Sequence, residues 1–132
     1  GIKDATGDLD RGRDLIERCG DRLAVYSGDD PTAMELILAG GKGNISVTAN
    51  VAPALMARLC ALALAGDRNG AEAINQQLSM LNAALFLEAN PIPVKWALQQ
   101  RGVIEGGIRL PLTPLDARYH DEVLAALEAA GI

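Results

Sequence analysis

Short apolar runs alternate with helical segments in the first half of the chain, and this alternation restricts the possible folds more than any other feature. The runs cover residues 1–3, 23–27 and 44–48, and each is followed by an amphipathic stretch. Equivalent strand positions are separated by about 20 to 24 residues, which is long enough for the helical crossover that joins two parallel strands. The pattern therefore predicts an α/β fold with three parallel β-α units.

The second half of the chain has a different pattern, which is helical throughout. Leu78, Leu81 and Leu85 continue a narrow apolar stripe that begins at Ile74, and this spacing is typical of one buried helix face. We predict two domains: residues 1–66 form the β-α units, and residues 67–132 form a small all-helical domain.

Three parallel strands are too few to form a closed or fully covered sheet. The first run has only three residues, and a sheet of this size leaves an edge unpaired and a face uncovered. The sequence also begins without a methionine. We expect the chain to be a piece of a larger α/β protein.

Composition excludes several classes of function. The chain is 49% hydrophobic and contains no apolar run near the length of about 20 residues that a membrane-spanning helix needs. Its net charge of −5 argues against a nucleic-acid partner. Cys19 and Cys60 match no metal-binding spacing and are expected to be reduced thiols. We predict a cytoplasmic protein with no metal and no cofactor.

Lys3 is the first candidate for chemistry. It lies at the carboxyl end of a predicted parallel strand, which is the side where active sites assemble in parallel α/β barrels. An uncharged lysine amine can attack a carbonyl carbon and form a Schiff base. A lysine near a terminus is, however, more often a solvated surface charge, so this position alone leaves both interpretations open.

Five sequence blocks carry a more specific signal because they occur in a fixed order along the whole chain. The blocks are GIKDATG (1–7), SGDD (27–30), GGKGNISVTANV (40–51), NPIPVKWAL (90–98) and RLPL (109–112). Together they resemble the dihydrodipicolinate synthase family of pyruvate-dependent Schiff-base aldolases. The resemblance extends over all 132 residues.

The resemblance implies a TIM (β/α)8 barrel, of which this chain would supply the sixth to eighth units and the helical domain that follows. The family condenses pyruvate with aspartate 4-semialdehyde in lysine and diaminopimelate biosynthesis, as a homotetramer built from two dimers. Lys3 matches the Schiff-base lysine. Gly28 and Ile45 match positions whose backbone lines the pyruvate pocket.

Two other functions remain open at this stage. A related Schiff-base aldolase could act on sugar acids, although the block at residues 90–95 argues against it, and the chain could be a non-catalytic assembly module. Residues 27–30 could suggest a metal site, but a turn with Asp30 as helix N-cap is the simpler interpretation. Because the family's other pocket residues lie upstream of Lys3, we expect the isolated chain to be inactive.

Overall fold

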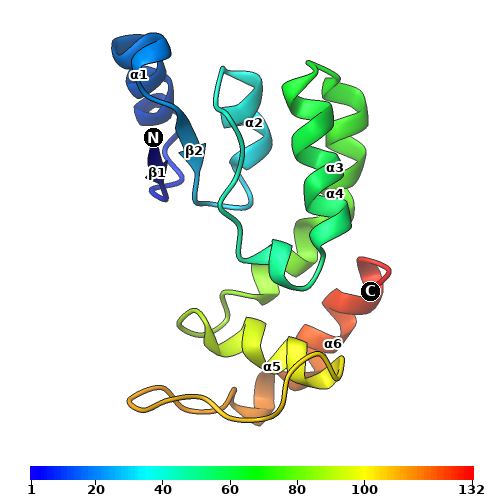
Figure 1. Cartoon of the computed structure of the whole chain (residues 1–132). Helices are drawn as coiled ribbons and strands as arrows, with labels where there is room; N and C mark the ends of the chain where they lie inside the picture. The colour runs from blue at the N-terminus through cyan, green and yellow to red at the C-terminus, as the bar shows by residue number, and fades with distance from the viewer.

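A computed structural model describes all 132 residues, and it contains a small parallel sheet at one end and a group of packed helices at the other (Figure 1). The strands are β1 (Ile2–Asp4) and β2 (Val25–Ser27). The helices are α1 (Leu9–Cys19), α2 (Ala33–Leu38), α3 (Pro53–Leu64), α4 (Arg68–Ala84), α5 (Ile92–Gln100) and α6 (His120–Ala129). Short 3-10 helices occur at η1 (Gly20–Arg22), η2 (Thr48–Asn50) and η3 (Ala117–Tyr119).

The parallel arrangement of the first two predicted strands is confirmed. β1 and β2 pair in parallel, with Lys3 opposite Tyr26 and Asp4 opposite Ser27. Helix α1 makes the crossover between them, and its first turn is capped by the Asp8 carboxylate, which accepts hydrogen bonds from the backbone N–H groups of Asp10 and Arg11. Side chains that are paired in this register lie on the same face of the sheet.

The third predicted strand, residues 44–48, is wrong in length and position. The segment 42–45 does run parallel to β2, but only Asn44 forms a bridge, with Ser27. The backbone N–H groups of Val47 and Thr48 instead donate to the Asp30 carboxylate, each over 3.0 Å. Because these two donors are already used, the strand cannot continue, and the chain turns into η2.

The predicted role of Asp30 as a helix N-cap is also wrong. Helix α2 begins at Ala33, and its N-cap residue is Thr32. The carboxylate of Asp29, not that of Asp30, accepts hydrogen bonds from Thr32. The donors are the Thr32 backbone N–H at 3.2 Å and the Thr32 hydroxyl at 2.6 Å. Asp29 therefore organises this turn, and Asp30 is free to bind the later loop.

The predicted helical half and its apolar stripe are confirmed. Leu78, Leu81 and Leu85 are fully buried, and α3 packs along α4 (Figure 1). One hydrophobic cluster extends from Met34 in α2 to Ala130 beyond α6, so it includes residues on both sides of Gly66. The domain boundary after residue 66 stays a prediction. None of the helices is both long and apolar enough to cross a membrane.

Candidate functional site

Lys3 occupies the middle of β1, one residue before the end of the strand, and its side chain is exposed in the chain. It lies against Gly28, which follows the end of β2. A Cβ atom on Gly28 would lie 2.8 Å from Cγ of Lys3 and 2.7 Å from Cβ of Ala5. The lysine stem therefore leans toward the carboxyl ends of the strands, over a position where only glycine leaves room.

The candidate residues Gly28 and Ile45 lie on neighbouring backbone segments at these strand ends. The Gly28 N–H donates to the Asp4 carbonyl at 2.7 Å, and the Ile45 N–H donates to the Ser27 carbonyl at 2.8 Å. Within the chain, the carbonyl oxygens of Gly28 and Ile45 accept no backbone hydrogen bond. The strand ends thus carry two carbonyl groups without a backbone partner in the chain, and the stem of Lys3 lies against one of the two residues, Gly28.

Lys3 forms no ion pair within the chain, although five other pairs are present. Its ammonium is therefore not held by a carboxylate. A nucleophilic lysine must be able to lose its proton, and a neighbouring carboxylate would stabilise the charged form. The absence of such a partner makes Lys3 compatible with attack on a carbonyl carbon.

Asp4 lies on the opposite face of the sheet and is nearly buried. Burial alone would raise the pKa of this carboxyl group, but hydrogen bonds from the Thr6 hydroxyl and N–H and the nearby Arg11 guanidinium outweigh it, so the pKa lies below its ordinary value of 3.8. The Arg11 Nε atom is 3.3 Å from Oδ2 of Asp4. These contacts tie the end of β1 to α1, directly beside Lys3.

We expect Asp4 to stabilise the fold in a pH-dependent manner. Because its pKa is lower in the folded chain than in the unfolded chain, its contribution is present above the ordinary carboxyl pKa and is lost as the pH falls through the folded value. Asp4→Asn should therefore flatten the acid limb of a plot of unfolding free energy against pH, measured by urea titration. Asp14→Asn is the matched control, since Asp14 forms an exposed pair with Arg18, and it should leave that limb unchanged. Equal slopes for wild type and Asp4→Asn would contradict this prediction.

A buried polar cluster behind the strand ends was not predicted from the sequence. Asp30, which is 2% exposed, accepts hydrogen bonds from Asn44 as well as from the N–H groups of Val47 and Thr48. The Thr48 hydroxyl in turn donates to Oδ1 of Asn82 in α4 at 2.7 Å. The one sequence signal was Asn82, a polar residue between Leu81 and the apolar stretch at residues 83–87.

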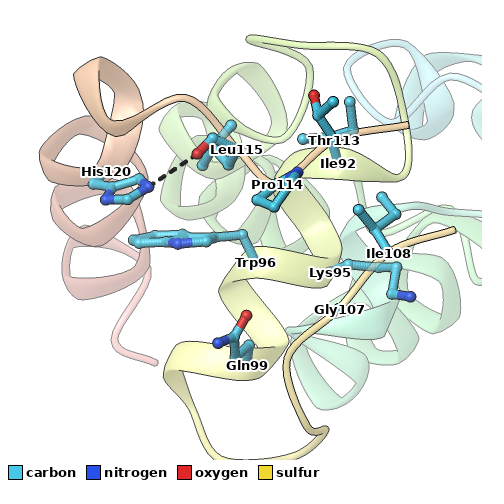
Figure 2. A pocket seen from close by; sticks show the side chains of 10 residues that line it. All are labelled: Ile92, Lys95, Trp96, Gln99, Gly107, Ile108, Thr113, Pro114, Leu115 and His120. Carbon is cyan, nitrogen blue, oxygen red and sulfur yellow. Dashed lines mark hydrogen bonds between the residues drawn. The ribbon is translucent and has the colours of Figure 1, made fainter. Parts of the chain in front are cut away.

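A separate cavity of about 260 Å³ lies in the helical half, between α5, the loop at residues 107–115 and the start of α6 (Figure 2). The imidazole of His120 stacks on the indole of Trp96, with ring centroids 4.3 Å apart, and its Nε2 atom lies 3.2 Å from the Leu115 carbonyl oxygen. His120 is partly buried at the start of α6. No carboxylate lines this cavity, and its ionisable side chains are those of Lys95 and His120.

No group of three or more His, Cys, Asp or Glu side chains is arranged to hold a metal ion. The fold and the strand-end residues define a parallel α/β protein with a lysine that has no ion-pair partner in the chain and with backbone carbonyls that accept no backbone hydrogen bond in the chain. The model of the dihydrodipicolinate synthetase family matches residues 1–130. The chain belongs to this family.

Individual relatives agree with this assignment. The chain is 65% identical to 4-hydroxy-tetrahydrodipicolinate synthase from Thioalkalivibrio sulfidiphilus and 61% identical to the enzyme of the same name from Marinobacter nauticus, over all 132 residues in each case. Among solved structures, it is similar to chloride-inhibited dihydrodipicolinate synthase from Acinetobacter baumannii in complex with pyruvate, with a TM-score of 0.98 and 55% identity over the whole chain. In all three comparisons the chain spans 45% of the relative's length.

Proposed function

We propose that this chain is the C-terminal part of a 4-hydroxy-tetrahydrodipicolinate synthase, a lyase of lysine and diaminopimelate biosynthesis. The observation that carries the proposal is the placement of Lys3 at the parallel strand ends, against Gly28 and without an ion-pair partner, in a member of this family. The relatives described above are named 4-hydroxy-tetrahydrodipicolinate synthase, and one similar solved structure contains pyruvate, which favours pyruvate and aspartate 4-semialdehyde over the sugar acids of related aldolases.

Lys3 would act as the nucleophile. Its neutral amine attacks the ketone carbon of pyruvate, and loss of water leaves an iminium ion on the lysine nitrogen. The iminium withdraws electrons, so that the methyl carbon loses a proton and the resulting enamine attacks the aldehyde carbon of the second substrate. Pyruvate itself has no hydrogen-bond donor, so the free carbonyls of Gly28 and Ile45 would accept from the hydroxyl and N–H groups that form when the Lys3 amine adds to the ketone.

The open sheet supports a larger architecture. β1 and the segment 42–45 each have one edge without a backbone partner in the chain. We propose that β1, β2 and the segment 42–45 are the sixth to eighth strands of a (β/α)8 barrel, whose earlier strands cover both edges and complete the pocket. Since Lys3 is exposed without them, the isolated chain is expected to be inactive. Assembly as a dimer of dimers and a cytoplasmic location stay predictions.

Imine trapping tests this proposal. The full-length protein that contains this chain would be incubated with pyruvate and reduced with borohydride, and the modified peptide would be identified by mass spectrometry. We expect one pyruvate adduct, located on Lys3, and no adduct on the isolated chain, because the pocket there is incomplete. A full-length protein that forms its adduct at another lysine, or none at all, would overturn the proposed role of Lys3.

A further inference from the structure

We propose that Thr48 and Asn82, acting through the buried Asp30 cluster, are positioning residues that hold the backbone of Ile45 in place for pyruvate binding. This inference rests on the proposed function, and it adds a contribution from the helical half of the chain to the site at the strand ends. Neither side chain is proposed to touch the substrate.

Ile45 is anchored on both sides by one carboxylate. Before it, the side-chain amide of Asn44 donates to Oδ1 of Asp30 at 2.7 Å. After it, the N–H groups of Val47 and Thr48 donate to Oδ2. The side chain of Ile45 is itself 49% exposed, so hydrophobic packing does little to hold this residue. The position of its backbone therefore depends on these polar contacts and on the single strand hydrogen bond to Ser27.

Thr48 connects this anchor to helix α4. Thr48 is 0% exposed and Asn82 is 3% exposed, and the hydroxyl-to-amide hydrogen bond joins residues 34 positions apart in the sequence. A buried polar group that loses its partner is costly, because no water replaces the lost hydrogen bond. The loop at residues 44–48 therefore has one favoured position relative to α4. The fully buried Leu78 and Leu81 hold α4 itself in the hydrophobic core.

Removing the Thr48 hydroxyl should release the loop at residues 44–48 from α4, while a valine preserves the shape of the side chain. In the full-length protein we expect Thr48→Val to raise the KM for pyruvate by roughly fivefold to tenfold, and to slow borohydride trapping at Lys3 when pyruvate is below saturation. Thr48→Ser retains the hydroxyl and should restore a KM near that of the wild type. Asn82→Ala removes the acceptor instead and should raise the KM in the same direction, which provides a second test if Thr48→Val does not fold.

A destabilising control separates positioning from general loss of stability. Leu78→Val truncates a fully buried apolar residue of the same helix, and it should lower the unfolding midpoint without raising the KM for pyruvate. The inference is overturned if Thr48→Val and Asn82→Ala keep the wild-type KM, if Thr48→Ser behaves like Thr48→Val, or if Leu78→Val raises the KM equally. Trapping at Lys3 in the wild type tests the proposed function separately, since it does not depend on any of these variants.

Discussion

Lys3→Ala in the full-length protein should reduce the rate of condensation of pyruvate with aspartate 4-semialdehyde by about a thousandfold or more. The alanine removes the amine that is proposed to form the imine, and no other lysine stem of the chain lies against Gly28. Because Lys3 forms no ion pair in the chain, its replacement breaks no such contact there, and we expect the unfolding midpoint to stay almost unchanged. The measurements are steady-state turnover and thermal unfolding of the same preparation.

Lys42→Ala is the matched control for this prediction. Lys42 is also exposed and also lies beside β2, where its N–H donates to the Val25 carbonyl, but it is at the amino end of its segment. Its removal should leave turnover within about twofold of the wild type, as for a surface substitution away from the site. Normal turnover by Lys3→Ala would show that the amine at the strand end has no chemical role.

Gly28→Ala should lower kcat/KM for pyruvate by about a hundredfold, which is the loss expected when a reacting group is displaced by about 1 Å. The new methyl group would lie 2.7 Å from Cβ of Ala5 and 2.8 Å from Cγ of Lys3. The lysine stem can move, but Cβ of Ala5 is attached directly to the backbone. Movement of the lysine stem displaces the amine, and movement of the Ala5 backbone displaces the end of β1 that carries it.

Gly106→Ala is the matched control for Gly28→Ala, because the structure can accommodate an alanine at position 106. Its Cβ would meet the side-chain amide of Gln99 at 2.9 Å, and that flexible, exposed side chain can rotate away. Kinetics with pyruvate and the fold of each variant, followed by circular dichroism, complete the test. A Gly28→Ala protein that is folded and fully active would show that close contact between Lys3 and Gly28 is not needed.

Local sequence patterns were sufficient to predict those structural features that depend on residues close together in the sequence. The parallel pairing of β1 with β2 follows from two apolar runs joined by a helical stretch, and the buried stripe on α4 follows from its spacing. The resemblance placed Gly28 at the pyruvate pocket, but the contact of the Lys3 stem with Gly28 was seen only in the structure. The resemblance to the family indicated which lysine to consider, since an isolated lysine would have been assigned to the surface.

Contacts between distant residues could not be predicted in this way. Trp96 and His120 are separated by 24 positions in the numbering, and their stacking depends on how the loop between α5 and α6 folds back. The hydrogen bond between Thr48 and Asn82 likewise requires α4 to pack behind the strand ends. Nothing in either local sequence specifies these partners.

The sequence by itself determined the first two parallel strands with their crossover helix and the helical second half, because both depend on periodicity. The choice of Lys3 came from the resemblance to the family. The tertiary structure decided where the third strand ends and where α2 begins. Asp30 had two possible uses, as a helix cap or as an acceptor for Val47 and Thr48, and only folding brings those distant N–H groups to its carboxylate. Since a buried carboxylate is stabilised by every donor that reaches it, the long-range contacts prevailed over the local cap.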